Sequence, residues 1–371
     1  MYKNFIKSSF FFLLILTING CSGTDSQQQL IDRAGAPLLS GLGDHSHEIT
    51  SDEEGVQEYF NQGLILAFAF NHAESVRSFK AAQTLDPSCA MCFWGEALAR
   101  GPNINVTSNG KAVMSDEQRV KAFEALGKAK DLMANSTPQE QAYITALSSR
   151  YDGDISSDRN ALDIAYAVAM GKVVETYPED MDAASLYSEA LMNTMPWNYW
   201  LDDGKPKSDT VKVITKLEEV LEREPNHPLA IHLYIHAVEA SNTPERAESA
   251  ADRLGSLVPG AGHLVHMPAH IFWRVGRYHD ASEANINAAK VDEEYIAQCN
   301  AQGFYPAAYY PHNIHFLWAA STMEGRSELS IESALKVSKY VSLEQIMMFP
   351  TIEYFHTIPL LSYVRFGKWD E

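Results

Sequence analysis

Apolar and small residues recur at every third or fourth position from Val56 to Pro87, which is the spacing of one face of an amphipathic helix. The pattern is interrupted at Asn71-His72, and Asp86-Pro87 ends the second periodic run because proline cannot continue a helix interior. The stretch therefore predicts two helices joined by a short turn.

The same kind of turn recurs later in the chain. Glycine followed by charged or polar residues separates periodic runs, and a Glu-Pro pair ends another run; these signals lie at Gly276–Ala281, Gly325-Arg326, 367–371 and Glu224-Pro225. Residues 101–114 and 195–208 lack the periodicity and are expected to be insertions between helices. No stretch alternates apolar and polar residues as a strand would, so the sequence predicts an all-α fold.

The hairpins resemble the tetratricopeptide repeat (TPR) family, whose unit is a helix hairpin of about 34 residues. Gly63, Ser75, Ala82 and Pro87 stand at the small, small, alanine and proline positions of that repeat. The resemblance implies a right-handed superhelical α-solenoid over residues 51–371, with a concave groove in which a peptide or protein partner docks. Because the sequence reaches Glu371 just after a hairpin turn, its last repeat is expected to be incomplete.

The N-terminus is typical of an export signal. Lys3 and Lys7 precede an apolar run at 10–18, which is about half of the roughly 20 residues that a membrane-spanning helix needs. The run leads into Gly20-Cys21, which resembles a bacterial lipobox and implies lipidation of Cys21. We therefore expect a signal peptide over 1–21, a flexible tether over 22–50, and a protein exported and anchored to the bacterial membrane through lipid alone.

Charge and cysteine content narrow the classes of function. The formal net charge is -19, which disfavours nucleic acid as a partner because phosphates would be repelled. Cys89 and Cys92 are expected to form a local disulfide or to be small buried residues, and three cysteines beyond Cys21 are too few to hold the fold together.

Histidines are concentrated in one quarter of the chain. Of 13 in total, nine lie between His227 and His315, where a uniform distribution would place about three. Seven of these histidines and Glu239 form three patterned groups, and the TPR register implies that the groups face the groove from three successive helices. The groups are His232, His236 and Glu239; His263, His266 and His270; and His312 and His315.

Imidazoles four residues apart share a helix face and can bind one metal ion. We therefore predict a transition-metal site formed by these seven histidines, with zinc, copper, iron or nickel as the ion. Glu239 is expected to orient a ring, to bind a second ion, or to act as a general base. Pro268 places His263 and His266 on a loop if the helix begins at Met267.

Several functions remain open at this stage. The metal could support catalysis, storage or delivery. Alternatively, the histidines could pack structurally or recognise a carboxylate ligand, and the protein would then be an interaction scaffold without metal. Three histidines at turns or loop ends are expected to be solvated: His72, His227 and His279. A set of aromatic residues is expected to wall a ligand pocket or to pack between helices: Trp197, Tyr199, Trp200, Tyr305, Tyr309 and Tyr310.

Overall fold

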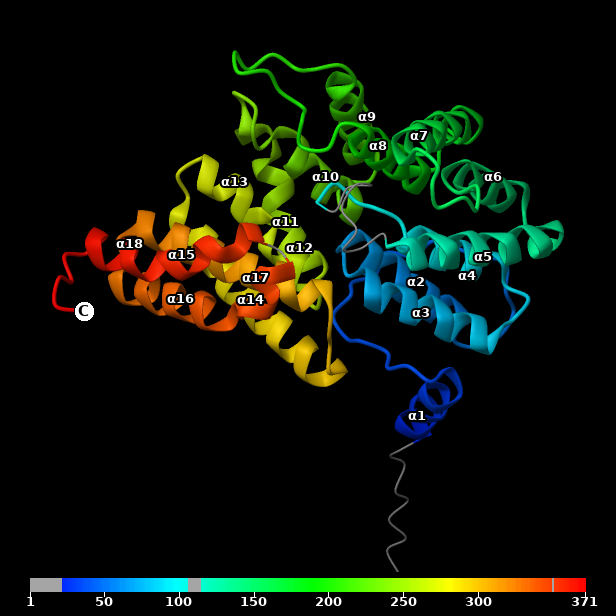
Figure 1. Ribbon diagram of the computed structural model, residues 1–371. Helices are drawn as coiled ribbons and strands as arrows, with labels where there is room; N and C mark the ends of the chain where they lie inside the picture. Colours follow the sequence, from blue (N-terminus) through cyan, green and yellow to red (C-terminus); the bar gives the residue numbers. More distant parts are fainter. Residues whose placement is uncertain (1–21, 106–114, 349) are drawn as a thin grey trace, which may run out of the picture.

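A computed structural model describes residues 22–105, 115–348 and 350–371, and within these ranges it contains helices and no β-strand (Figure 1). The prediction of an all-α fold is therefore confirmed. The α-helices are α1 (Ser22–Ala34), α2 (Val56–Phe68), α3 (His72–Leu85), α4 (Ala90–Ala99), α5 (Asp116–Leu132), α6 (Pro138–Leu147), α7 (Arg159–Thr176), α8 (Met181–Thr194), α9 (Thr210–Arg223), α10 (Pro228–Val238), α11 (Glu248–Leu257), α12 (Gly262–His266), α13 (Pro268–Arg274), α14 (Tyr278–Cys299), α15 (Tyr310–Glu324), α16 (Ser327–Tyr340), α17 (Leu343–Met348) and α18 (Ile358–Arg365).

The helix boundaries lie where the sequence signals stand. Helices α2 and α3 are separated at residues 69–71, and α3 ends just before Asp86-Pro87. Gly276 and Gly325 follow α13 and α15 with φ of 85° and 84°, in the left-handed region that glycine adopts without steric cost. No helix spans residues 195–209, as the sequence predicted for the second insertion.

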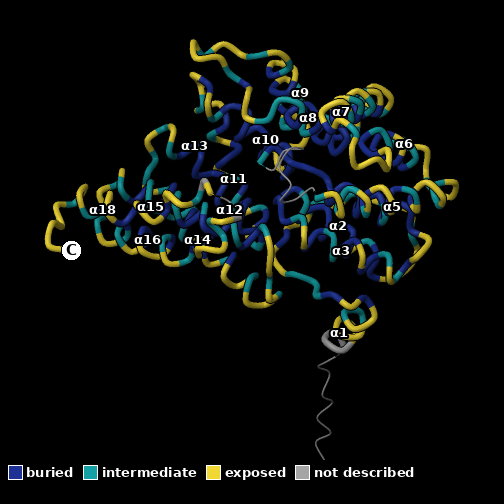
Figure 2. Tube along the Cα trace, viewed as in Figure 1, coloured by how far each residue is buried: buried dark blue, intermediate teal, exposed yellow. Residues whose placement is uncertain are grey.

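Consecutive helices pack against each other, among them α2 with α3, α4 with α5, α7 with α8, and α14 with α15 and α16. One large apolar core runs from the N-terminal helices to α15, and a smaller core joins α16 and α18 to α14 and α15. Figure 2 shows the buried residues following the inner side of this helix array, with exposed residues on its outer turns.

Helices that are far apart in the sequence also meet. Helix α2 contacts α10, and Tyr295 of α14 donates hydrogen bonds to Asn71 and Glu74 of the first hairpin. Tyr309 lies within hydrogen-bond distance of Asn103, which follows α4. Because of these contacts, the first hairpin lies beside α10 and α14 (Figure 1).

The region predicted as a flexible tether differs from that expectation. Residues 22–34 form α1, and the segment that follows is attached to the helical body by side-chain hydrogen bonds. Gln62 accepts from the Leu39 amide at 2.7 Å, and Gln57 donates to the His47 carbonyl at 2.8 Å. The polar composition that suggested a tether instead supplies hydrogen-bonding partners for α2. The signal peptide and Cys21 lie outside the described residues.

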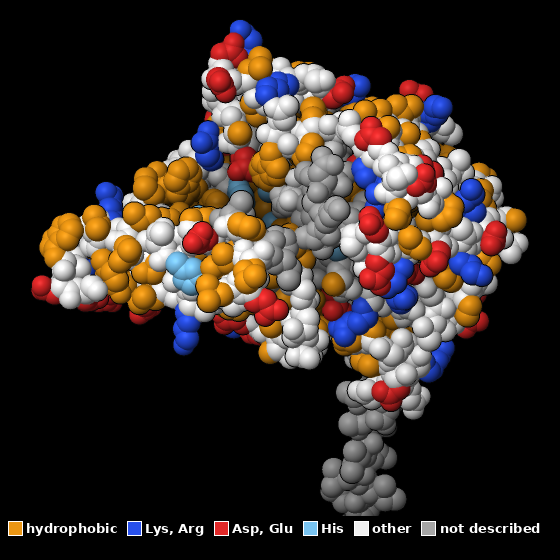
Figure 3. Space-filling model, viewed as in Figure 1, with side chains coloured by type: hydrophobic (Ala, Val, Ile, Leu, Met, Phe, Trp, Pro, Cys, Tyr) orange, Lys and Arg blue, Asp and Glu red, His pale blue; other side chains and the backbone are white. Residues whose placement is uncertain are grey.

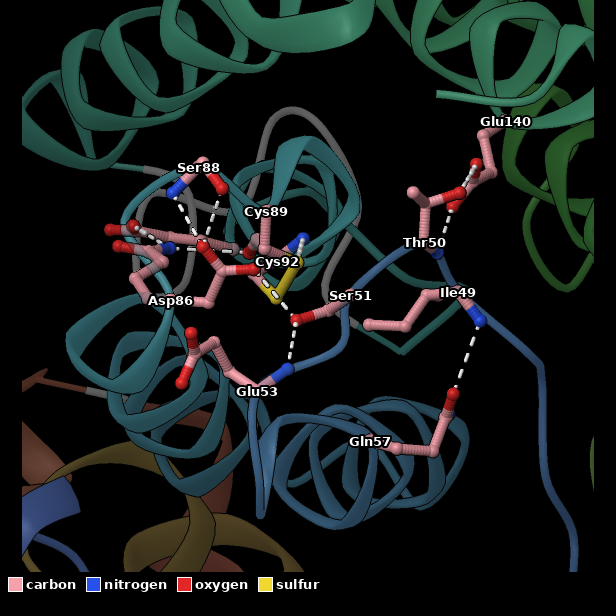
Figure 4. The surroundings of a disulfide bond; sticks show 12 residues. Ile49, Thr50, Ser51, Glu53, Gln57, Asp86, Ser88, Cys89, Cys92 and Glu140 are labelled. Carbon is pink, nitrogen blue, oxygen red and sulfur yellow. Dashed lines mark hydrogen bonds between the residues drawn. A yellow bond between two sulfur atoms is a disulfide. The ribbon is translucent and has the colours of Figure 1, made fainter. Parts of the chain in front are cut away.

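Cys89 and Cys92 are joined by a disulfide at the start of α4 (Figure 4), so the local bond that the sequence suggested is present. Both residues are buried. Asp86, just before them, accepts hydrogen bonds from the Ser51 hydroxyl at 2.6 Å and from Ser88, and thus connects the chain before α2 to the turn that precedes α4.

Among the described residues, no helix is long and apolar enough to cross a membrane.

A buried ion pair fixes the turn between α6 and α7. Arg150 donates to Asp163 at 2.8 Å, and both side chains are almost fully buried. We predict that Asp163→Ala lowers the free energy of unfolding by about 3–5 kcal/mol, because it leaves the Arg150 charge buried without its partner. Chemical denaturation monitored by circular dichroism measures this. Glu117→Ala, which removes an exposed pair with Lys121, serves as the control and should leave the unfolding midpoint unchanged; equal effects of the two substitutions would contradict the prediction.

Candidate metal centre

Four helices supply the histidines of one buried cluster. His232 and His236 lie four residues apart on α10, so both rings project from one face. His263 and His266 lie on α12, His270 on α13 and His312 on α15. The loop predicted for His263 and His266 is thus replaced by a short helix, which ends at Met267 so that Pro268 occupies the first turn of α13.

The six rings form two adjacent triads. His232, His236 and His263 make the first, and in each triad one ring nitrogen from every residue lies within 4.8 Å of the other two. His266, His270 and His312 make the second. Rings of the two triads also touch: the centroids of His236 and His270 are 5.4 Å apart, and those of His263 and His266 are 5.8 Å apart. The cluster therefore offers two three-nitrogen sites side by side.

Glu239, one turn beyond His236, links the two triads. One of its carboxylate oxygens lies 3.0 Å from Nδ1 of His236, and the other lies 2.8 Å from Nδ1 of His270. Burial by itself raises the pKa of Glu239, but the two histidines more than offset this and hold it far below its usual range. A carboxylate accepts hydrogen bonds and cannot donate them, so Nδ1 of both rings carries the proton and both Nε2 atoms are left with free lone pairs.

Two further rings are oriented in the same way. Nδ1 of His232 donates to the Phe68 carbonyl at 2.7 Å, at the end of α2. Nδ1 of His266 donates to Oδ1 of Asn285 at 2.6 Å, and the Asn285 amide is oriented by its own bond to the Ala281 carbonyl. Four of the six histidines thus have Nδ1 bound to an oxygen and Nε2 free to accept.

The free lone pairs face one another. Nε2 of His266 lies 2.9 Å from Nε2 of His270 and 3.1 Å from Nε2 of His312. Since the Nδ1 atoms of His266 and His270 hold the protons, two lone pairs meet at a distance at which they repel. A cation between them removes this repulsion.

The first triad contains buried nitrogens without partners. Among the described residues, Nε2 of His232, Nε2 of His236 and both ring nitrogens of His263 are buried and make no hydrogen bond. Leaving a buried polar atom unpaired costs about 1–3 kcal/mol. These atoms converge on one point, so one bound ion would pair a nitrogen of each ring.

Burial lowers the pKa of five of the six histidines. Burial and the proximity of other imidazoles hold the pKa of His232, His263 and His266 well below the usual value, and burial likewise lowers the pKa of His312 to about 3. Neutral imidazole is the form that binds a metal ion.

The cluster is reached from the surface on one side. His312 is partly exposed, and Figure 3 shows histidine side chains at the bottom of a hollow.

Phe70 packs against the first triad from a strained backbone position. Its φ is 57°, which is unusual for a bulky residue and costs roughly 1–2 kcal/mol. The ring centroid lies 4.5 Å from that of His232 and 5.5 Å from that of His263. The strained conformation therefore places an apolar wall on the side of the triad that faces α2.

The predicted aromatic wall is present in part. Trp197 contacts His236 edge-on at 5.0 Å, and Tyr309 contacts His263 at 4.7 Å. The Tyr305 hydroxyl accepts from the His263 amide and donates to buried Asp292. Tyr199, Trp200 and Tyr310 serve helix and loop packing instead: Trp200 donates to the Ala237 carbonyl, for example.

His315 is the predicted ligand that the structure does not bring into either triad. It lies three residues after His312 on α15, but its ring stacks on Trp318 at 5.2 Å and contacts Tyr354 and Phe355. Three residues turn a helix by about 300°, so His312 and His315 point in directions about 60° apart. Only the first of these directions leads to the cluster.

Two of the expectations for turn histidines were wrong. His227 is buried at the start of α10, and His72 is mostly buried against the Ala99 carbonyl, where burial lowers its pKa to about 4. His279 is exposed, as expected. Sequence reasoning missed Asn285 and the Phe68 carbonyl, for which the sequence holds no signal. It also missed His45 and His47, whose alternating spacing was a signal hidden in the supposed tether.

The buried imidazoles predict how the stability of the metal-free protein depends on pH. A histidine whose pKa is lower in the folded than in the unfolded state contributes its full stability above about pH 6.5, and each costs about 1.4 kcal/mol per pH unit below that value. We expect the free energy of unfolding to fall by at least about 3 kcal/mol between pH 7 and pH 5, measured by denaturation in the presence of a chelator. His279→Ala is the control: it removes an exposed histidine whose pKa is raised by Glu324, so the fall between pH 7 and pH 5 should persist. A profile that stays flat between pH 7 and pH 5 would show that the cluster is not kept neutral.

Comparison with known proteins does not assign this site to a family. No protein-family model matches the sequence, and no curated protein is significantly similar to it. The chemistry of the cluster must therefore be argued from its own geometry.

Proposed function

We propose that the protein binds two transition-metal ions side by side, one in each histidine triad. The ligand atoms are the Nε2 atoms, except at His263, where either ring nitrogen can bind. The observation that carries this proposal is the 2.9 Å contact between Nε2 of His266 and Nε2 of His270, two rings whose Nδ1 protons are fixed by oxygen acceptors. Structural packing does not require lone pairs to face each other, whereas metal binding does. Outer acceptors that hold the second nitrogen are the usual partners of metal-binding histidines.

Copper fits the ligand set best. Each triad consists of imidazoles alone, and among the described residues the carboxylate in hydrogen-bond contact with the rings is that of Glu239. Burying charge is costly, so two monovalent ions beside one carboxylate leave less uncompensated charge than two divalent ions. Imidazole suits copper, and among the divalent first-row ions copper exceeds its neighbours in affinity for nitrogen donors. Iron and manganese are less well matched, since both triads lack a carboxylate and the group that contains one, Glu239 with His236 and His270, takes its histidines from both triads.

Three ligands per ion leave coordination positions open for a small molecule. Two adjacent ions with open positions would supply a site at which such a molecule could be polarised or could exchange electrons. The chain's own groups shape that space: Phe70 and Tyr309 close it on one side, while His312 and the half-exposed Trp197 lie on the more open side. Glu239, held as a carboxylate by the two histidines, is a positioning residue and a weak base.

The arrangement of the helices supports a solenoid of the TPR type for the body of the protein. Consecutive helices pack in pairs, and α2–α3, α13–α14 and α15–α16 turn at the positions predicted from the repeat. An open groove for a peptide is less well supported as the function, because the imidazoles at the groove positions are buried. Export and lipid attachment at Cys21 remain part of the proposal, and the Cys89–Cys92 disulfide favours the oxidising compartment that export implies.

Metal analysis tests the paired centre. Protein loaded with Cu(I) under anaerobic conditions and then desalted is expected to retain two equivalents of copper, measured by mass spectrometry. His232→Ala combined with His270→Ala removes one ligand from each triad and should abolish retention while helicity is preserved. His315→Ala is the matched control on α15 and should retain two equivalents. Full copper retention by the double variant would rule out the paired centre.

A second substitution tests the role of Glu239. Gln at this position can accept from only one ring, so either His236 or His270 must move its proton to Nε2, the ligand atom. We expect Glu239→Gln to keep the copper stoichiometry and to weaken affinity by about 10–100-fold in a chelator competition. Glu324→Gln disrupts a similar Glu–His pair on the surface, with His279, and should leave affinity unchanged. An unchanged affinity in Glu239→Gln would show that Glu239 does not orient the ligands.

A further inference from the structure

A second cluster of histidines surrounds a single carboxylate, away from the paired triads. His45 and His47 come from the segment before α2, Asp182 from the first turn of α8, and His227 from the residue before α10. More than 130 residues of sequence separate Asp182 from the first two histidines. Only the tertiary fold brings these four side chains together.

The contacts within the cluster are short and converge on Asp182. Nε2 of His45 and Nε2 of His227 lie 2.9 and 3.1 Å from Oδ1, and Nδ1 of His47 lies 2.7 Å from Oδ2. The rings of His45 and His227 also contact each other, with centroids 4.8 Å apart. Three imidazoles therefore present one nitrogen each to a single carboxylate that is itself largely buried.

This set of donors is that of a zinc site. Zn²⁺ takes four ligands in a tetrahedron, commonly histidine nitrogens and carboxylate oxygens at about 2.0–2.2 Å, which places neighbouring ligand atoms roughly 3.3 Å apart. The nitrogens of His45 and His227 lie 2.9 and 3.1 Å from Oδ1 of Asp182, and that of His47 lies 2.7 Å from Oδ2, so each nitrogen–oxygen pair needs to separate by only a few tenths of an ångström. His45, Asp182 and His227 already place their ligand atoms within 4.8 Å of one another.

The surroundings favour a divalent cation. His45, His47 and Asp182 line an open cavity of about 510 Å³, whose lining also includes Glu48, Glu140, Glu179, Asp180 and Glu224. His227 lines a second cavity, to which His45 also belongs. Asp180 forms a further ligand group with His47 and Asp182, whose atoms again lie within 4.8 Å of one another. An acidic cavity raises the local concentration of cations and gives them a path to His45, His47 and Asp182.

We propose that His45, His47, His227 and Asp182 form a zinc-type site, separate from the paired imidazole centre. The two sites differ in charge: this one offers a carboxylate ligand and acidic surroundings to one divalent ion, whereas each triad offers three neutral nitrogens. The site also connects the segment that precedes α2 to α8 and α10, so a bound ion holds this segment on the helical body.

The alternative is a clasp made of hydrogen bonds alone, and it makes a different prediction for zinc. Nδ1 of His227 accepts from the Ala230 amide at 3.3 Å, so Nε2 carries the proton that is donated to Asp182. An ion that binds at this Nε2 requires the ring proton to move to Nδ1, which breaks the bond from the Ala230 amide. The zinc site takes up Zn²⁺ through the lone pairs of neutral imidazoles, whereas a hydrogen-bonded clasp takes up no zinc.

Zinc uptake by the full chain tests the proposal. In a background of His236→Ala and His270→Ala, which removes one ligand from each triad, the protein is expected to retain one equivalent of Zn²⁺ after desalting. Adding His45→Gln and His47→Gln should reduce this to none, while adding His279→Gln, an exposed histidine, should leave one equivalent. Calorimetric titration should show binding of one equivalent of Zn²⁺ by the first protein and no binding by the second.

A second measurement distinguishes the loss of the zinc site from misfolding of the variant. In the otherwise unaltered chain, His45→Gln with His47→Gln should lower total zinc by one equivalent and leave Cu(I) retention at the level of the unsubstituted protein. Circular dichroism should show equal helicity. Equal zinc retention with and without His45 and His47, in either background, would overturn the proposal, as would the absence of zinc from the background protein.

Discussion

The carboxylate of Glu239 is the interaction on which the paired imidazole centre depends. By accepting from Nδ1 of both His236 and His270, it fixes the tautomer of one ring in each triad and couples the two. If either ring turned over, an N–H would point into the cluster in place of a lone pair. The Phe68 carbonyl and Asn285 extend the same constraint to His232 and His266, so the direction of the ligand atoms is set by acceptors on α2, α10 and α14.

This arrangement explains why the first hairpin must lie beside α10. The Phe68 carbonyl is available because α2 ends there, and the strained backbone at Phe70 then turns an aromatic ring onto His232 and His263. The Phe68 ring contacts the cluster around Asp182: its centroid is 5.7 Å from that of His45 and 6.2 Å from that of His227. The end of α2 therefore supports both clusters.

Charge distinguishes the two clusters chemically. The triads are buried among apolar and aromatic side chains, and their imidazoles are neutral because protonation there would bury charge. The cluster around Asp182 borders a cavity lined by carboxylates. Burial alone would raise the pKa of Asp182, but hydrogen bonds from His227, His45 and His47 hold it well below its usual value. A protein with both environments can separate soft nitrogen-preferring ions from harder divalent ones.

The sequence by itself determined the helices and the face of each helix on which a histidine lies. Periodicity, the Asp86-Pro87 stop and the glycines after α13 and α15 are local signals, and local backbone energetics decide where helices begin and end. The spacing of His232 and His236 placed this pair on one face of α10 because helical geometry is fixed at 3.6 residues per turn. Six of the seven histidines predicted as ligands lie in the two triads.

Only the tertiary structure decided which faces meet. His315 shares α15 with His312, yet its direction leads to Trp318 and Tyr354, and the difference depends on how α15 is rotated against α12. Glu239 could have bound an ion or moved protons, and its contact with His270 on another helix gave it the orienting role. The sequence showed no partner for His45, His47 and His227. Asp182 lies more than 130 residues after the first two and more than 40 residues before the third. Helical periodicity is written in neighbouring residues, whereas the contacts that assemble a site depend on the packing of the whole chain.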